Sequence, residues 1–428
     1  MMKSFMRTLI IATLISTSSV FGAPAVDSVE ELAQLAVEQN QAVHELNAQI
    51  SALKEKSQAV RIFKDPMVGL SFVNYPWDSL SLGETPMTGI QLRVEQEFPL
   101  PGKNQRRQAV VESEIKAREW AREELKIQLK GMVKESYFKL TLVRQLKVII
   151  QQHIILVTQF LDAVQAKYES GKANQHDVLR LELLQDKLKD DLNDFTQKER
   201  EISSAINATL HRNITINITT PVTLSAPEPN STFDMLLEHA KETRPLLSQI
   251  QEMSEMKKRA AQLAALERYP DFKLWSSYRY REEAGLDDGT DFLSFGASIA
   301  IPIDYLKRFK AKEKQHEFDS VSFDRRYDSI VDSISSQLEG SLAKWERAFQ
   351  KYEKYHSTLV PDARKTLDAT FAAYQTDRVD FASLYQAELQ LLDFEREIQI
   401  SSANAAIMQV NIETLTGRTL KSTLQKGE

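Results

Sequence analysis

The sequence predicts a mainly α-helical protein with a small β part, in which one unit of helix, two strands, very long helix, tight turn and helix occurs twice. Three observations lead to this prediction. Similar residues recur at a nearly constant offset, long segments without proline are rich in helix-forming residues, and four segments of about ten residues alternate between apolar and polar side chains. The length of 428 residues allows two or three ordinary domains or one duplicated unit.

The first 25 residues have the pattern of a secretory signal peptide. Lys3 and Arg7 precede an apolar run at 9–14, and residues 23–25 read Ala-Pro-Ala, a cleavage site of the A-x-A type. Loss of residues 1–25 removes two cations and no anion, so the formal net charge changes from −6 to −8. The sequence therefore predicts an exported, acidic protein. Its lack of cysteine excludes disulfides, thiolate zinc sites and a lipid anchor on cysteine.

Composition limits the class of protein further. Charged residues make up 27% of the chain and the mean hydropathy is −0.37, which argues against both a disordered chain and a polytopic helical membrane protein. We expect no segment after the N-terminus to be long and apolar enough to cross a bilayer as a helix. An isoelectric point near 5.8 argues against nucleic acid as the main partner.

The repeat consists of short similar stretches at offsets between 203 and 206 residues. Examples are 36–40 with 240–244, 98–100 with 301–303, and 161–163 with 367–369. A nearly constant offset over most of the chain indicates a tandem duplication. We place the two copies at 28–220 and 231–421, joined by the proline-rich linker 221–230.

The segment 103–168 predicts one very long helix, because it lacks proline and is rich in Glu, Lys, Arg, Gln, Leu and Ala. Such a helix would extend ~100 Å and must therefore pack against other helices. Apolar residues at three- and four-residue spacing from Leu142 to Ala163, with His153 among them, predict a coiled-coil seam. The second copy predicts an equivalent helix at 306–374, with a kink expected at Pro361.

Four segments predict strands of ~10 residues that have one apolar and one polar face. They are 67–75 and 88–98, within the range 66–98, and 271–281 and 291–301, within the range 270–301. On the apolar face lie residues such as Leu92 and Phe295, and on the polar face Gln91 and Ser298. This length and alternation are typical of strands in outer-membrane barrels. The polar segments 76–86 and 282–290 predict hairpin loops in water.

Four strands are too few to close a barrel, and open sheet edges in lipid would leave backbone groups without hydrogen bonds. Two chains would supply 8 strands and a barrel filled by its own side chains, whereas three would supply 12 strands and room for a pore. The polar strand faces need water, which favours the trimer. The alternative is a pair of small soluble hairpins packed on the helix ends.

The order and spacing of four motifs resemble the TolC family of outer-membrane channel-tunnel proteins. Residues 96–103 (Q-E-F-P-L-P-G-K) lead from a strand into the long helix, and 300–303 (A-I-P-I) stand at the equivalent second exit. Residues 168–171 (Y-E-S-G) and 411–417 (N-I-E-T-L-T-G) are similar to the family's helix-turn and C-terminal patterns. Together with the duplication, the resemblance covers nearly all of the mature chain.

The resemblance implies a homotrimer with a 12-strand β-barrel in the outer-membrane lipid of a Gram-negative bacterium and a 12-helix α-barrel in the periplasm. It also implies a passive duct of a tripartite efflux system, which carries small toxic solutes or metal ions. The duct would dock onto a periplasmic adaptor protein and an inner-membrane pump of the resistance-nodulation-division type. Two other functions remain open: a duct for type I protein secretion, and a coiled-coil scaffold without a pore.

Two segments, 74–78 and 86–89, together with the strand-to-helix motif, look most like family members that accompany heavy-metal efflux pumps. Many relatives in that subgroup are lipid-anchored on a cysteine, which this chain does not have.

The turns at 170–174 and 376–380 interrupt the long helices at matching places and are the best candidates for a functional site. By the resemblance they form the periplasmic tip. The residues expected to contact the adaptor are Gly171, Lys172, Ala173, Asp377, Arg378 and Val379. The plain alternative is a simple turn in which Gly171 ends a helix in the left-handed conformation.

The resemblance also predicts a gate just beyond the turns. Family members often place acidic residues one helical turn after the second turn, but here Ser383 and Gln386 occupy these positions. Asp177 and Arg180 occupy the equivalent positions after the first turn. We therefore expect the gate to be held by polar contacts or by pairing of Asp177 with an arginine.

The sequence predicts neither an enzyme nor a resident metal or cofactor. It contains no nucleophile elbow, phosphate-binding loop or zinc-protease motif, and its seven histidines show no pairing at helical spacing. Met253 and Met256 lie one turn apart, but we interpret them as packing residues in a helix seam. His153 is likewise interpreted as a core or tunnel-packing residue.

Overall fold

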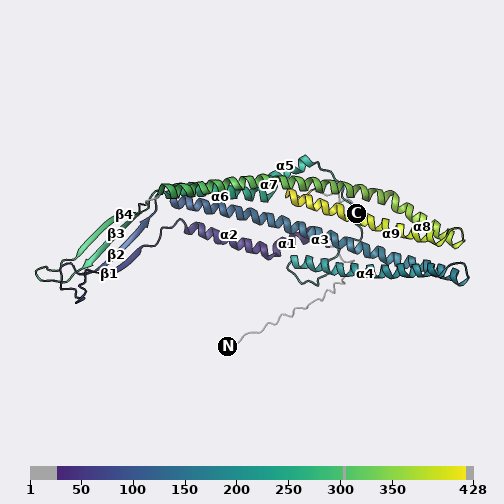
Figure 1. The fold of residues 1–428 in the computed structure, drawn as a ribbon, viewed down its shortest axis with the longest axis horizontal. Coiled ribbons are helices and arrows are strands. Elements are labelled where there is room, and N and C mark those ends of the chain that lie inside the picture. Colours follow the sequence, from purple (N-terminus) through teal and green to yellow (C-terminus); the bar gives the residue numbers. More distant parts are fainter. Residues whose placement is uncertain (1–26, 302–304, 421–428) are drawn as a thin grey trace, which may run out of the picture.

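The protein is an elongated bundle of helices with a small sheet at one end and two helix turns at the other (Figure 1). The computed structural model describes residues 27–301 and 305–420. The predicted signal peptide at 1–25 lies outside the described residues. The first half contains α1 (Val29–Gln39), α2 (Gln41–Ala59), β1 (Met67–Val73), β2 (Gly89–Phe98), α3 (Lys103–Glu169) and α4 (Gln175–Thr209). The second contains α5 (Phe233–Thr243), α6 (Pro245–Glu267), β3 (Phe272–Tyr280), β4 (Phe292–Ile299), α7 (Tyr305–Lys354), η1 (Tyr355–Leu359), α8 (Val360–Gln375) and α9 (Phe381–Thr416).

The order of two helices, two strands, a long helix and a returning helix occurs in both halves. The segment between α4 and α5 contains the predicted linker 221–230 and is tied to the bundle. Trp345 Nε1 of α7 donates a hydrogen bond to the carbonyl oxygen of Pro227 at 2.9 Å, and Gln145 Nε2 of α3 donates one to that of Val222 at 3.1 Å. The bounds that we place on the two copies stay a prediction.

The long helix α3 starts at the predicted residue and ends one residue after the predicted end. It contains an 18-residue window with a mean hydropathy of 1.3, which by length and composition alone is apolar enough to cross a membrane. The expectation that no such segment follows the N-terminus was therefore wrong. Half of that window is buried inside the protein. The apolar composition of α3 is thus explained in part by its packing against α4, α6 and α9.

The second long helix is interrupted just before Pro361. Between α7 and α8 the chain forms one π-helical turn, η1, in which the Val360 N–H bonds to the carbonyl oxygen of Tyr355. Proline lacks an N–H and cannot bond to the carbonyl oxygen of Ser357, four residues earlier. The expected kink therefore takes the form of a wide turn on the N-terminal side of the proline.

The four strands form one antiparallel sheet in the order β1-β2-β3-β4 (Figure 1). The central pair joins the two halves of the chain, because Phe98 of β2 lies opposite Phe272 of β3. Leu92 lies opposite Leu70 on one side and Tyr278 on the other. The two hairpins are therefore not separate units packed on the helix ends, which was the alternative left open by the sequence.

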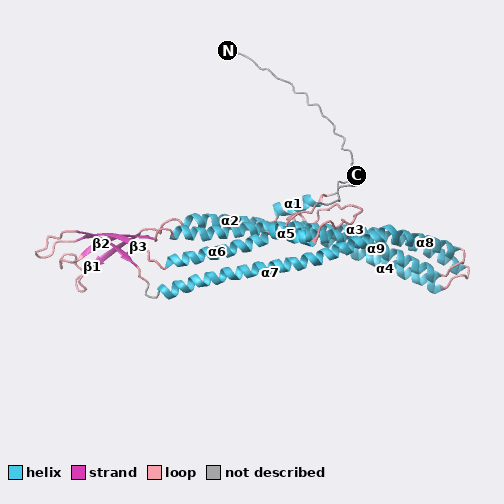
Figure 2. Cartoon of the chain, turned by 90° about the horizontal axis from the view of Figure 1, so that it is seen from above, coloured by secondary structure: helices cyan, strands magenta, loops and turns pink. Residues whose placement is uncertain are grey.

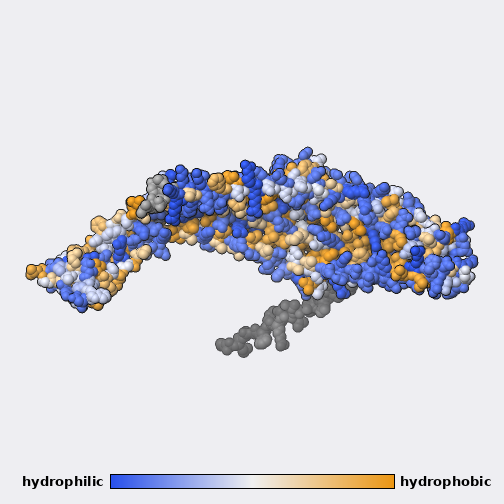
Figure 3. Space-filling view, viewed as in Figure 1, coloured by the Kyte–Doolittle hydropathy of each residue, from blue (hydrophilic) through white to orange (hydrophobic). Residues whose placement is uncertain are grey.

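Three apolar clusters hold the helices together. Nearest the turns, α3, α4, α8 and α9 meet around Phe160 and Leu384. Further along the bundle, α1, α3, α4 and α9 meet around Leu140, and α5, α7 and α9 meet around Trp345. Apolar side chains also reach the surface in patches along the bundle and on the sheet (Figure 3). A single chain therefore leaves considerable apolar surface uncovered.

Candidate functional site: the sheet and the helical tip

One face of the sheet is apolar and exposed. Residues directly opposite each other in an antiparallel sheet project to the same side, so the register assigns each side chain to a face. Leu70, Leu92, Tyr278 and Leu293 form one row across all four strands. In the single chain, 82% of the accessible surface of Phe295 is exposed on this face. Such exposure is costly in water and is expected where the sheet meets lipid.

The other face of the sheet carries charged and polar side chains. Glu95 lies between two cations, 2.9 Å from Arg93 Nη2 and 3.2 Å from Lys273 Nζ. Arg279 Nη2 donates a hydrogen bond to Gln91 at 2.8 Å, and the Arg93 guanidinium lies over the Trp275 ring at 4.4 Å. This network spans β2 and β3, so the predicted division into an apolar and a polar face is present in the structure.

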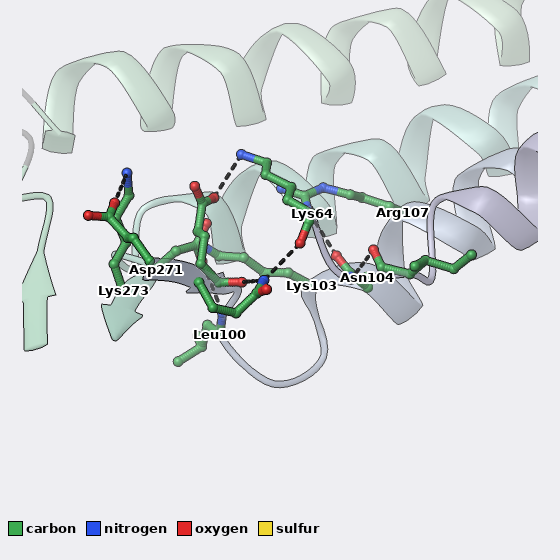
Figure 4. Close-up of polar contacts among 11 residues, drawn as sticks. Lys64, Leu100, Lys103, Asn104, Arg107, Asp271 and Lys273 are labelled. Carbon is green, nitrogen blue, oxygen red and sulfur yellow. Dashed lines mark hydrogen bonds and ion pairs between the residues drawn. The ribbon is translucent and has the colours of Figure 1, made fainter. Parts of the chain in front are cut away.

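The strand-to-helix junction explains part of the motif at 96–103 (Figure 4). Lys103 is buried at the start of α3, and its Nζ contacts Asp271 Oδ1 at 2.6 Å and the carbonyl oxygen of Tyr269 at 2.5 Å. The same carboxylate oxygen accepts a hydrogen bond from the Leu100 N–H at 2.9 Å. Gly102 has φ of 97°, a conformation that other residues rarely adopt. The motif thus joins the first long helix to the first strand of the second half.

The two turns at the far end of the bundle have the same backbone pattern. In the first, the Lys172 N–H bonds to the carbonyl oxygen of Lys167 at 2.8 Å, and Gly171 has φ of 76°. In the second, the Arg378 N–H bonds to the carbonyl oxygen of Ala373 at 2.9 Å, and Asp377 has φ of 57°. Both are helix C-terminal turns with a left-handed residue at the same place.

Asp377 links the two turns. Its Oδ2 lies 3.1 Å from Lys172 Nζ, and its Oδ1 contacts the Lys167 ammonium. Hydrogen bonds from Lys167 and then Lys172 hold the pKa of the Asp377 carboxyl below its usual value. Lys167 Nζ also lies 4.4 Å from the centre of the Tyr374 ring. These contacts compensate for the left-handed backbone of a residue that is not glycine.

A cleft of about 540 Å³ lies between the turns. Its lining includes six residues that the sequence singled out: Lys172, Ala173, Asp177, Arg180, Asp377 and Val379. Gly171, Arg378, Ser383 and Gln386 are exposed nearby and are not part of the lining. The structure therefore brings the two predicted turns together at one surface.

The gate residues do not form the expected ion pair within one chain. Asp177 is buried, and its Oδ2 accepts a hydrogen bond from the Asn174 N–H at 3.2 Å at the start of α4. Its Oδ1 lies 3.0 Å from His176 Nε2. The Arg180 guanidinium instead lies 5.6 Å from the centre of the Tyr385 ring. Asp177 therefore has a helix-capping role, because a carboxylate in the first turn satisfies a free backbone N–H.

The other two gate positions differ from each other. The Ser383 N–H and hydroxyl group both donate to Asp380 Oδ1, at 2.9 and 2.6 Å, so Ser383 belongs to the cap of α9. Gln386 is exposed. Neither residue supplies a charge to this end of the bundle.

The sequence did not predict an ionic cluster around His153. His153 is 2% exposed, and its Nδ1 and Nε2 lie 2.6 and 3.0 Å from Glu388 Oε1 and Glu395 Oε2 of α9. Arg364 of α8 also contacts Glu395. Burial alone would lower the pKa of His153, but the hydrogen bonds to the two glutamates outweigh burial and raise it to about 9. The predicted packing residue is therefore a buried cation that joins α3 to α9.

No protein-family model matches the sequence, and no curated protein is significantly similar to it. Among solved structures, CusC, described in connection with folding and transmembrane channel formation, has a TM-score of 0.76 and 14% identity over 92% of both chains. The outer membrane protein VceC from Vibrio cholerae has a TM-score of 0.74 and 14% identity, over 92% of this chain and 97% of VceC.

The outer membrane channel MtrE of Neisseria gonorrhoeae has a TM-score of 0.73 and 16% identity, over 92% of this chain and 89% of MtrE. This chain has the fold of these outer-membrane proteins. The predicted TolC-like channel-tunnel fold of a single chain is thereby confirmed. The identities are low, so the similarity establishes the fold, and the heavy-metal subgroup stays a prediction.

Proposed function

We propose that this protein is the outer-membrane channel of a tripartite efflux system in a Gram-negative bacterium. It would be a passive trimeric duct that carries small toxic solutes or metal ions from an inner-membrane pump, through the periplasm and the outer membrane. The observation that carries the proposal is the four-stranded sheet, apolar on one face and polar on the other, on a fold shared with outer-membrane channels.

The open edges of the sheet support the trimer. Among the described residues, β1 and β4 each pair with a neighbour on one side only. In lipid, their free N–H and C=O groups would lack hydrogen-bond partners at a cost of several kcal/mol each. Three copies would supply 12 strands, a barrel wide enough for water, into which the face with Arg93 and Glu95 would point. The apolar face with Leu92 and Phe295 would then meet lipid.

The helical tip supports docking onto a partner. The cleft between the turns is lined by both cations and anions, including the exposed Lys172 and Asp377, and Gly171 and Arg378 are exposed beside it. We propose that a periplasmic adaptor protein contacts the tip at Gly171, Lys172, Ala173, Asp377, Arg378 and Val379, and that the pump is of the resistance-nodulation-division type. The same end would carry the gate.

The test combines oligomeric state with conductance. The purified full-length protein should be a trimer in detergent and should give stepwise conductance in planar lipid bilayers. After cell fractionation it should be found in the outer membrane. A stable detergent monomer with its full strand content would contradict the barrel. A trimer that fails to conduct under any voltage or pH would instead favour the scaffold without a pore.

A further inference from the structure

Next to the sheet, the helices form a layer in the order α2, α3, α6 and α7, with each helix packed on the next. Figures 1 and 2 both place α2 and α7 at opposite edges of this layer. Each of these helices leads into or out of an edge strand, α2 into β1 and β4 into α7. The free edges of the sheet and of the helical layer therefore lie on the same two sides of the chain.

The packed side of α7 is fixed by its contacts with α6. Lys312 pairs with Glu267, and Asp319 pairs with Lys257. Exposed residues at three- and four-residue spacing form a stripe that points away from α6: Ala311, Lys314, Phe318, Val321 and Arg325. The exposed fractions of Phe318 and Val321 are 73% and 50%. Phe318 and Val321 lie one helical turn apart, so together they form an exposed apolar patch on the free side of α7.

The free side of α2 has the opposite character. Val43, Ile50 and Ser57 are buried in the bundle. About half a turn away lies a stripe of exposed small and acidic residues: Glu45, Ala48, Ala52, Glu55 and Ala59. Alanines at this spacing leave a shallow groove along the helix that accepts large side chains from another helix. The acidic residues make this side unsuited to contact with lipid tails.

We propose that α7 of one copy packs antiparallel on α2 of the next copy in one defined register. The pairs are Ala311 with Ala59, Lys314 with Glu55, Phe318 with Ala52, Val321 with Ala48, and Arg325 with Glu45. The two helices run in opposite directions, because α2 leads toward the sheet and α7 leads away from it. The residue numbers in every pair sum to 369 or 370, as a single antiparallel register requires.

The side chains of α7 and α2 are complementary in size and charge along the whole proposed contact. Each large apolar residue of α7 faces an alanine of α2, and each cation faces an anion. The same neighbour would also supply the missing partner of each edge strand. The inference rests on the proposed trimer, and it adds the helix faces and the register by which the copies recognise each other.

The absence of cysteine from the chain allows a direct test by disulfide crosslinking. Two double variants of the full-length protein place cysteines in register: Ala59→Cys with Ala311→Cys, and Ala48→Cys with Val321→Cys. The control, Ala59→Cys with Val321→Cys, moves one cysteine ten residues along α7, about 15 Å. A disulfide requires Cα atoms within about 7 Å. We expect covalent trimers on oxidation of both registered variants and none in the control.

Charge exchange provides an independent test. Glu55→Lys should place two cations together and lower the apparent assembly constant at least about tenfold in dilute detergent, because like charges at a contact repel strongly. Glu55→Lys combined with Lys314→Glu should restore assembly. Glu112→Lys, at an exposed residue of α3, is the control for the charge change itself.

The outcomes separate this inference from the proposed function. If the unmodified protein is a conducting trimer but the control crosslinks as well as the registered variants, the register is wrong and the channel stands. The same holds if the double charge exchange fails to restore assembly. If the unmodified protein is monomeric, the proposed trimeric channel fails first.

Discussion

Replacing His153 by glutamine should show how much the buried cluster between α3 and α9 contributes to stability. The His153 ring is hydrogen-bonded to Glu388 and Glu395, and Glu388 Oε2 has no hydrogen-bond partner among the described residues. Glutamine preserves polarity and approximate size but carries no charge. The variant therefore leaves two buried carboxylates, of which Glu395 keeps its contact with Arg364.

The magnitude follows from the pKa of His153. The folded chain raises it from 6.5 to about 9, which corresponds to about 3 kcal/mol of stability from the protonated ring. Because the folded pKa is the higher one, this contribution is complete below pH 6.5 and is lost as the pH rises through 9. Removing one partner of a buried ion pair generally costs about 3–5 kcal/mol. The pKa shift and this general cost therefore give similar values for the stability lost at neutral pH.

The contribution of Glu395 has the opposite pH dependence. Burial alone would raise the pKa of this carboxyl, but the hydrogen bonds from His153 and Arg364 outweigh burial and lower it. A lowered pKa gives stability that is present above 4.5 and is lost as the pH falls below that value. The cluster should therefore be most stabilising between pH 4.5 and pH 6.5, where both contributions are fully present.

The assay is denaturant unfolding of the detergent-solubilised protein at pH 7 and pH 10, followed by circular dichroism. His153→Gln should lose about 3 kcal/mol at pH 7 and much less at pH 10, where the unmodified protein has lost the same charge. His356→Gln, at an exposed histidine of η1, is the control and should change stability little at either pH. An equal loss at both pH values, or no loss at pH 7, would refute the assignment of a charged His153.

Three further predictions follow from the sheet and the tip. Phe295→Arg should weaken membrane insertion by about 2–4 kcal/mol if the residue lies near the bilayer centre. Ser294→Arg, on the polar face, is the control and should be tolerated. The heat stability of the trimer in lipid measures the effect of each variant. Gly171→Val should strain the left-handed backbone although no atom lies within 4 Å of the added Cβ, so export in cells should fall while the trimer persists in native mass spectrometry. Asp177→Ala should destabilise the start of α4 by about 0.5–2 kcal/mol, seen as faster hydrogen exchange at the tip, and Arg180→Ala should not; unchanged exchange in the first variant would contradict the capping role.

Much of the fold was predictable because the decisive signals are local. Two signals lie within one element each: the absence of proline between residues 103 and 168, and the alternation of apolar and polar side chains around Leu92. Each predicted the bounds of its helix or strand to within a few residues. The pairing of β2 with β3 was not predictable in this way. It depends on contacts between halves of the chain, and the periodicity of one strand does not identify its neighbour.

The chemistry of the interior was harder to predict than its packing. His153 was correctly placed in a helix seam, but its partners Glu388 and Glu395 lie 235 and 242 residues later in the sequence. One local signal was available, because these two glutamates lie seven residues apart on the same side of α9 as the buried Leu384 and Leu391. Acidic residues on an apolar face indicate a buried cation.

The role of Asp177 also had a local signal. Asn174 followed three residues later by an acidic residue, just after a turn, is typical of a helix N-terminus. Pairing of Asp177 with an arginine was one of the two expected ways of holding the gate, and within a single chain Asp177 caps α4.

The pairing of β2 with β3 has a consequence for how the chain folds during synthesis. Phe98 and Phe272 are neighbours in the sheet but stand 174 positions apart in the sequence, so β2 is paired only with β1 until β3 has been made. Until then the first hairpin presents an unpaired strand edge and an apolar face to water. Contacts this distant in sequence form slowly, and such intermediates are prone to aggregate. Pairing of β2 with β3, which makes the two halves one sheet, is thus also the folding step before which the newly made protein is most prone to aggregate.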